Sequence, residues 1–283
     1  MPIIKTLLKA TKLEKEKFKI PKSVQDAIPI QRIWPDGIFQ VGSRFSKTFS
    51  FTDINYSIAG KEDKTAMFLD YSELLNALDS GASAKITINN RKINKAEFEQ
   101  SLLLPMKEDG LDHFRKEYNE MLLSKVTGTN NSVVQDRYIT ITVAKRNIDE
   151  ARTYFSRVGT DLITHLSQLS SIGRELDAGT RLQIFRDFFK GGEPAAFEFN
   201  LKKQMKNGHS FKDWLCPDSM EFQKDHFRLN DRWGRVLYLQ GYASYIKDSM
   251  IAELCDMDRS LMLSIDILPV PTDEAVREIQ DKL

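Results

Sequence analysis

The sequence predicts an α+β fold, arranged as two mixed subdomains whose sheets are covered by helices. Three observations lead to this prediction. Several segments alternate apolar and polar residues with the period of a β-strand, and longer segments between them repeat apolar residues every three or four positions, as amphipathic helices do. The composition is that of a globular chain, with 41% hydrophobic and 29% charged residues in a total of 283.

The first subdomain is predicted to span residues 23–175. Apolar and polar residues alternate at 47–55, 84–89 and 137–143, which indicates strands. The third is the clearest, because Ile139, Ile141 and Val143 would share one face. Apolar residues recur at spacings of three and four in the segments where we expect helices, at 62–78, 96–103, 111–126 and from Asn147 to 169.

The second subdomain is predicted to span residues 176–283, after the turn-forming stretches 170–173 and 177–179. A short helix ends at Phe188-Phe189, and Ser210 is expected to cap another. Strands are expected at 233–242 and 261–268, with a helix at 246–257 between them. Proline stops a strand at Pro271, so Thr272 is expected to cap a final helix.

Charge and composition argue against several functional classes. The chain has 41 basic and 40 acidic residues, so its net charge of +1 does not suit a protein built around a nucleic-acid phosphate track. It contains no run of 18 apolar residues and no signal-peptide core. Cys216 and Cys255 are expected to be reduced thiols. These features indicate a cytoplasmic protein.

The motifs that carry chemistry are missing or incomplete. The segment Gly37-Ile-Phe-Gln-Val-Gly42-Ser43 has the glycine spacing of a phosphate-binding loop, but Ser43 stands where the lysine is required. Gly208-His-Ser210 begins a nucleophile elbow that the next residues do not complete. No histidine has another histidine or a cysteine within five positions. We therefore predict no catalytic, cofactor-binding or metal-binding residue in this chain.

Residues 1–22 form a basic N-terminal arm. Seven lysines face two glutamates, a net charge of +5: Lys5, Lys9, Lys12, Lys15, Lys17, Lys19 and Lys22 against Glu14 and Glu16. Four apolar residues, Ile3, Ile4, Leu7 and Leu8, would share one side of a short helix. The arm is either a docking element for a membrane surface or a partner, with Lys5 to Lys19 as its contacts, or a solvated terminus.

A second basic group combines cations with an aromatic ring, a pairing that can neutralise phosphates and stack on bases. Its members are Lys202, Lys203, Lys206, Lys212, Arg228, Arg232, Trp233 and Arg235. The same residues also fit a solvated turn and strand face, which the neutral total charge favours. Contact with nucleic acid therefore stays open.

Three stretches near the start of the chain have a distinctive sequence. They are Ile28-Pro-Ile-Gln-Arg-Ile-Trp-Pro-Asp-Gly37, Lys47-Thr-Phe-Ser-Phe-Thr-Asp-Ile-Asn-Tyr56 and Glu62-Asp-Lys-Thr65. Later pieces follow in order: Arg137-Tyr-Ile-Thr, Trp233-Gly-Arg-Val-Leu-Tyr238 and Cys255-Asp-Met-Asp258. From about Ser23 onward, the chain resembles the N-terminal region of the VirB-four-like (TraC/TrbE/CagE-type) conjugal transfer ATPases of type IV secretion, in the branch of Gram-positive conjugative elements.

The resemblance implies an assembly part of a DNA-transfer motor and no catalytic residue here. In that family the phosphate-binding loop and the rest of the ATPase domain lie further along, so we expect them downstream of residue 283. The implied partners are inner-membrane components of the secretion channel and the chain's own ATPase domain, with homo-oligomerisation in the full-length protein. The implied location is the cytoplasmic face of the cell membrane, as a peripheral protein.

Three hypotheses for function follow. The first is a non-catalytic assembly and docking domain of such an ATPase, with no cofactor in this chain. The second is a single-stranded nucleic-acid-binding module that uses the group around Trp233. The third is a stand-alone enzyme with a site built from scattered residues, which a deep pocket with shifted carboxylates would support.

Overall fold

The computed structural model describes residues 21–54, 56, 58–92, 103–128, 133–190, 206, 210–241, 245, 247, 249–257 and 259–281. Helices and antiparallel sheets occur together, so the predicted α+β class is confirmed. The predicted helix at 96–103 falls almost entirely outside the described residues.

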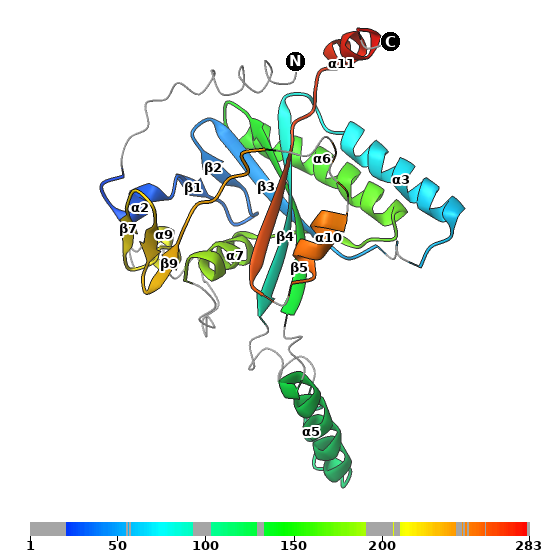
Figure 1. Ribbon diagram of the computed structural model, residues 1–283, viewed down its shortest axis with the longest axis vertical. Helices are drawn as coiled ribbons and strands as arrows, with labels where there is room; N and C mark the ends of the chain where they lie inside the picture. The colour runs from blue at the N-terminus through cyan, green and yellow to red at the C-terminus, as the bar shows by residue number, and fades with distance from the viewer. Residues whose placement is uncertain are drawn as a thin grey trace.

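A seven-stranded antiparallel sheet forms the centre of the described part (Figure 1). Its path is β1-β2-β3-β5-β4-β10, and β6 pairs with β3 beside β2. The strands are β1 (Arg32–Ile33), β2 (Phe39–Val41), β3 (Arg44–Phe51), β4 (Ala82–Lys92), β5 (Val133–Ala144), β6 (Gly173–Glu175) and β10 (Leu261–Ile267). The strands predicted at 84–89 and 137–143 fall within β4 and β5, whereas those predicted at 47–55 and 261–268 correspond to β3 and β10, which already end at Phe51 and Ile267.

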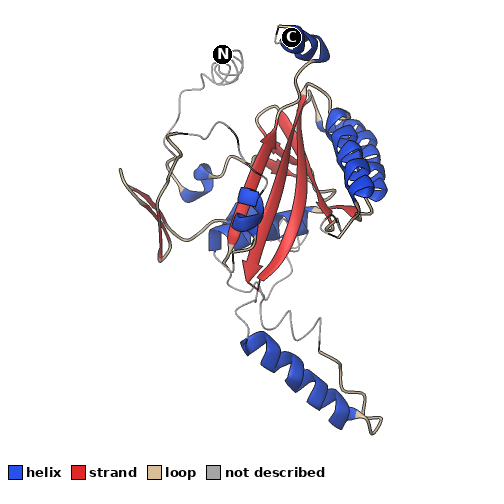
Figure 2. Cartoon of the chain, turned by 45° about the vertical axis from the view of Figure 1, so that its right-hand side comes forward, coloured by secondary structure: helices blue, strands red, loops and turns tan. Residues whose placement is uncertain are grey.

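One face of this sheet carries the main hydrophobic core. Ile139, Ile141 and Val143 of β5 are buried together there, as their alternation predicted. Helices α3 (Lys61–Asn76) and α6 (Ile148–Gln168) cover this face (Figure 2). The amide oxygen of Asn147 accepts the N–H of Glu150 at 2.9 Å, which confirms the predicted start of α6.

A second, smaller core lies between helix α7 (Ala178–Lys190) and the early part of the chain. Leu182 of α7 packs there with Ile28, Ile30 and Phe39, and with Leu215 of α9 (Phe211–Leu215). Ser210 caps α9 in a capping box with Asp213, so its predicted role is confirmed. Two other helices are α2 (Val24–Ala27) and α10 (Ser249–Cys255).

The sheet and the smaller core both combine residues from either side of the predicted division at 175/176. Strand β10 pairs with β4 from Leu261↔Asn90 to Ile267↔Ala84. The smaller core joins residues 28–39 to residues 178–216. The described chain therefore has a central sheet shared by both predicted subdomains, because strand pairing at long sequence separation leaves no local pattern.

The C-terminal third departs from the predictions in three places. A small sheet of β7 (Met220–Phe222), β8 (Phe227–Leu229) and β9 (Arg232–Gly234) ends at Gly234, so the strand predicted at 233–242 is wrong after that residue. Helix α10 is shorter than the predicted 246–257. Pro271, and not Thr272, is the N-cap of α11 (Thr272–Gln280), which has no side-chain capping bond.

Candidate interaction surfaces

The most prominent feature outside the central sheet is a helical projection, which we call the α5 arm (residues 103–128). It consists of a loop at 103–111 and helix α5 (Asp112–Gly128). Strands β4 and β5 pair as far as Lys92↔Val133, and the arm lies beyond the end of this hairpin, pointing away from the sheet (Figures 1 and 2). Its position leaves most of its surface free of the rest of the described chain.

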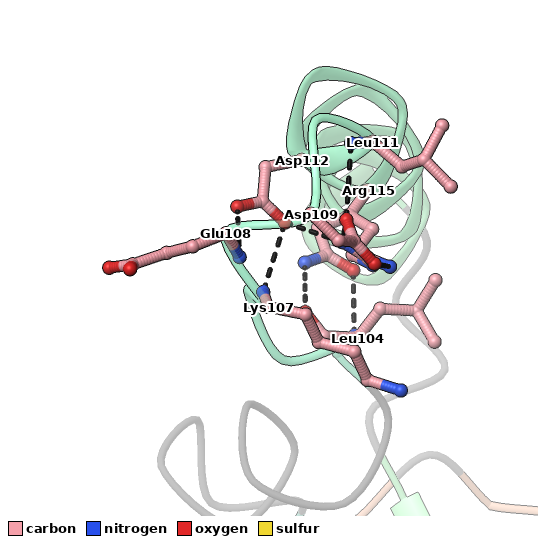
Figure 3. A network of polar contacts seen from close by, with 8 residues as sticks. Leu104, Lys107, Glu108, Asp109, Leu111, Asp112 and Arg115 are labelled. Carbon is pink, nitrogen blue, oxygen red and sulfur yellow. Dashed lines mark hydrogen bonds and ion pairs between the residues drawn. The ribbon is translucent and has the colours of Figure 1, made fainter.

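Asn119 ties the loop of the α5 arm to its helix. Its side-chain oxygen accepts the N–H of Leu104 at 2.9 Å, and its amide nitrogen donates to the Leu104 carbonyl at 2.9 Å (Figure 3). The Asn119 side chain thus binds both the N–H and the C=O of Leu104, as a paired residue of a neighbouring β-strand would. Asn119 is buried although it lies on a projecting helix. The pattern of apolar residues could not reveal this role.

A charged network fixes the turn that leads into α5. Asp112 accepts the N–H groups of Lys107 and Glu108 at 3.0 and 2.9 Å. The guanidinium of Arg115 binds both Asp109, at 2.5 Å, and Asp112, at 2.6 Å (Figure 3). The turn is therefore held by an arginine placed between two carboxylates, and by backbone donors at the start of a helix.

These contacts shift the ionisation of the three groups. Hydrogen bonds from Arg115 and from the N–H of Leu111 lower the pKa of Asp109 to about 2. The N–H of Lys107 and the guanidinium of Arg115 lower the pKa of Asp112. The same carboxylates raise the pKa of Arg115. Both carboxylates are thus charged at neutral pH, and each attracts the guanidinium of Arg115 that lies between them.

The polar network holds a set of apolar side chains in the solvent. Six of them are between 43% and 59% exposed: Leu104, Met106, Leu111, Phe114, Tyr118 and Met121. Leu111, Phe114, Tyr118 and Met121 follow the helical spacing that the sequence showed. That spacing would normally face a core, but here the stripe is left uncovered by the described residues. Exposed clusters of Phe, Tyr, Met and Leu are typical of protein interaction sites.

The second surface is the β7–β9 sheet, where part of the predicted nucleic-acid group comes together. Trp233 is 68% exposed. Arg228 pairs with it across β8 and β9, and its guanidinium lies 5.8 Å from the centre of the indole ring. Arg228 also forms an ion pair with Glu221 at 3.2 Å. Arg232 is in the same strand as Trp233, and Arg235 follows that strand.

The other predicted contact residues do not join this surface. Lys212 donates from Nζ to the carbonyls of Gln25 and Ile28 at 2.9 and 2.8 Å, which fastens α9 to the end of α2. Lys206 is exposed. The remaining ones, Lys202, Lys203 and the docking lysines Lys5, Lys9, Lys12, Lys15, Lys17 and Lys19, lie outside the described residues.

The near-match to a phosphate-binding loop has a structural explanation. Gly37 has a φ of +80°, and a Cβ added there would lie 1.9 Å from the carbonyl oxygen of Leu176. Gly42 has a φ of +59° in the turn between β2 and β3. The segment continues into a strand, and not into the helix that a phosphate loop needs.

Beside this loop lies Arg181 of α7, which the sequence analysis missed. It is 4% exposed, and its guanidinium donates to the carbonyls of Gly37 and Ser46 at 2.6 and 2.8 Å. The guanidinium lies 4.0 Å from the centre of the Phe39 ring. Burial lowers the pKa of Arg181 to about 9. This arginine fastens α7 to β2 and β3.

A shallow hollow of about 680 Å³ lies over α6. Its two arginines are each held by an aspartate, Arg152 by Asp36 at 2.8 Å and Arg157 by Asp79 at 3.1 Å. In the described part of the chain, no cluster of three or more histidine, cysteine or acidic side chains could hold a metal ion. None of the helices described is both long and apolar enough to cross a bilayer.

Neither the protein-family models nor the curated proteins match this chain.

Proposed function

We propose that this chain is a non-catalytic assembly and docking domain of a VirB-four-like conjugal transfer ATPase, which contacts inner-membrane components of a type IV secretion channel. The observation that carries the proposal is the α5 arm, where a rigid polar network presents an apolar stripe to the solvent. A docking element of this kind loses little conformational entropy when it binds, because its shape is already set.

The composition of the stripe suits a protein partner. Phe114, Tyr118 and Met121 are of the types enriched in interface cores, and Glu117 and Glu120 flank them as part of a polar rim. Aromatic residues of this kind commonly carry most of the binding energy of an interface. The basic arm at residues 1–22 would add attraction to the anionic inner face of the membrane, which places the domain next to channel subunits.

The test is association with the channel. The full chain is co-expressed with tagged inner-membrane subunits from the same conjugative element, and membranes are solubilised and purified on the tag. We expect the chain to co-purify, and the double variant Phe114→Ser/Tyr118→Ser to lose at least about 90% of this association, as hot-spot residues would. The matched control, Phe68→Ser/Phe222→Ser, removes two exposed aromatic rings elsewhere and should co-purify normally.

Equal retention of both double variants would contradict the role of the α5 arm. Absence of co-purification with any channel subunit would contradict the proposed function itself. DNA transfer from cells that carry each variant in the full-length gene gives an independent readout, and only the α5 variant should lower it.

Single-stranded nucleic-acid binding is kept as a second candidate, because Trp233 is exposed and has a guanidinium over its ring. Such binding would fall on Trp233→Ala and weaken steeply with salt, since phosphate contacts release counterions. Binding measured by fluorescence anisotropy with an oligonucleotide tests it. Affinity unchanged by Trp233→Ala would remove this candidate.

A further inference from the structure

The segment after β9 exposes a run of large apolar side chains. Four consecutive residues, Val236, Leu237, Tyr238 and Leu239, are between 66% and 83% exposed. Residues 235–239 form neither helix nor strand, and their backbone makes no backbone hydrogen bond with any described residue. A run of large apolar side chains with a free backbone marks a site of pairing with another chain.

The sequence of this segment is that of a strand. Valine, leucine and tyrosine lie between Gly234 and Gly241, and positions 236–240 contain neither proline nor charge. This pattern is why a strand was predicted at 233–242. The strand is missing because a strand needs a partner, and pairing of the segment ends where β9 leaves β8 at Gly234. We call residues 235–240 the donor segment.

A matching acceptor exists in the same molecule. Strand β10 lies at the end of the central sheet and, among the described residues, pairs on one side only, with β4. Within the described part of the chain, no strand pairs with the N–H and C=O groups on its other side. Its apolar residues Leu261, Leu263 and Ile265 are only half-buried. Natural edge strands are usually protected by proline, lysine or a bulge, but β10 contains only one charged residue, Asp266.

We propose that two copies of this chain exchange their donor segments, so that residues 235–240 of each copy add a strand to the β10 edge of the other. The six-residue donor matches the seven residues of β10 in length. Main-chain bonds along the new ladder would supply affinity, and alternate side chains would cover the half-buried face of β10. Because each copy gives and receives one strand, the exchange closes into a two-fold dimer.

We assign the donor that binds the β10 edge to a second copy of the chain, because the donor segment of the same copy is attached to the β7–β9 sheet. Gly234 pairs with Phe227 in the β7–β9 sheet, which both views show beside the central sheet and apart from β10 (Figures 1 and 2). The donor segment therefore starts from a different sheet than the one that ends in β10. This proposal is independent of the proposed function, since it uses neither the α5 arm nor a membrane partner.

The first experiment is sedimentation equilibrium of the full chain over a wide concentration range, comparing the native chain with Leu237→Pro, Tyr238→Pro and Leu237→Thr. Proline removes a backbone N–H and prevents ladder formation, whereas threonine keeps both the N–H and the strand propensity. Since consecutive N–H groups alternate in direction, one of the two proline positions must face the partner. All three variants should keep the melting temperature of the monomer, because Leu237 and Tyr238 are exposed.

We expect a monomer–dimer equilibrium in which at least one proline variant raises the dissociation constant by about tenfold or more. The substitution removes one hydrogen bond from each of the two ladders, and each lost bond changes an equilibrium constant by roughly fivefold. Leu237→Thr should stay within about threefold of the native chain, because its main-chain bonds remain. A monomer at every concentration overturns the proposal. So does a dimer that tolerates both prolines, or one that is lost in Phe114→Ser but not in the proline variants.

The second experiment identifies the acceptor. A photo-reactive phenylalanine analogue replaces Tyr238, and copies labelled with nitrogen-15 are mixed with unlabelled copies before irradiation. Mass spectrometry should find cross-links between residue 238 and the peptide containing 261–267, including links that join a labelled to an unlabelled copy. Cross-links confined to one copy, or directed to a segment other than β10, would refute the exchange.

Discussion

At the scale of single residues, Gly37 shows how a backbone contact determines which amino acid is possible. Its φ of +80° is costly for a residue with a side chain, and a Cβ would lie 1.9 Å from the Leu176 carbonyl oxygen. We expect Gly37→Ala to lower the free energy of unfolding by roughly 2–4 kcal/mol, which combines left-handed strain with overpacking against backbone. Urea denaturation measures this loss.

Gly42→Ala is the matched control for this prediction. Gly42 has a φ of +59°, but a Cβ would meet nothing within 4 Å. Gly42→Ala should therefore lower the free energy of unfolding only by the cost of the left-handed backbone conformation, about 1 kcal/mol. If both variants lose the same stability, the close approach of Leu176 has no energetic importance.

Arg181 carries a buried charge, and its guanidinium donates hydrogen bonds to neutral acceptors. Its Nη1 donates to the carbonyls of Gly37 and Ser46, and its Nη2 donates to the Ser46 hydroxyl at 3.2 Å, while the guanidinium lies over Phe39. A lysine ammonium has one nitrogen and no planar group, so it cannot replace both donor nitrogens and the contact with the Phe39 ring. We expect Arg181→Lys to lower the free energy of unfolding by about 1–3 kcal/mol, because buried acceptors lose their donors. Thermal or urea denaturation of the full chain tests this.

The exposed Arg174 of β6 provides the comparison for that substitution. Arg174→Lys should change the free energy of unfolding by less than about 0.5 kcal/mol, as surface substitutions usually do. A loss at Arg181 no larger than the loss at Arg174 would show that the buried fork does not stabilise the fold.

At the scale of elements, the α5 arm depends on ion pairs that resist acid. Arg115 and the Leu111 N–H lower the pKa of Asp109 from 3.8 to about 2. A carboxyl group whose pKa is lower in the folded state stabilises the fold at pH values above its pKa in the unfolded chain. This contribution is lost as the pH falls through the pKa of the folded state. The stabilisation of the turn by Asp109 should therefore be complete above about pH 4, decline between pH 3.8 and about 2, and be absent at lower pH.

The measurement is a carbon-13 NMR titration of the Asp109 carboxyl in the full chain. Its midpoint should lie well below 3.8 and move upward in Arg115→Gln, because the largest cause of the shift is removed. A midpoint that Arg115→Gln leaves unchanged would contradict the assigned role of Arg115.

Local pattern was sufficient to predict elements whose environment matches their pattern. Alternation located β5, and apolar spacing with the Asn147 cap located α6, because both pack on the main core. The same reasoning found the stripe of α5 but not its exposure, which depends on the β4–β5 hairpin that carries it. The shape of the α5 arm also depends on the hydrogen bonds of Asn119 and Asp112. The spacing of short polar residues in a sequence does not indicate which groups they bind.

At the scale of the whole molecule, the central sheet depends on pairings between distant parts of the chain. Strand β10 joins β4, although the turn-rich residues 170–179 suggested a division between two subdomains that separates these strands. Turn composition reports where the chain bends, but not whether the strands on either side of the bend share a sheet. Arg181 strengthens this connection by binding α7 to strands of the first half.

The last prediction concerns attachment of the whole molecule to an anionic membrane. The chain is nearly neutral, with a net charge of +1, so any attraction must come from local charge. Residues 1–22 carry a net +5, and each lysine near an anionic surface contributes on the order of 1 kcal/mol within a Debye length. The four apolar residues between Ile3 and Leu8 form too short a stripe to hold alone. Attachment should therefore be reversible and salt-sensitive.

Co-sedimentation with vesicles tests this with two variants of equal charge. One replaces Lys5, Lys9 and Lys12 with glutamine, and the other replaces the exposed Lys61, Lys107 and Lys116. Only the first should lose binding to vesicles that contain anionic lipid, because the field of a charged surface acts on charges that approach it closely. Neutral vesicles should bind neither variant nor the native chain. Equal losses in the two variants would mean that net charge, and not the N-terminal arm, governs attachment, and binding that persists at high salt would mean that apolar insertion dominates.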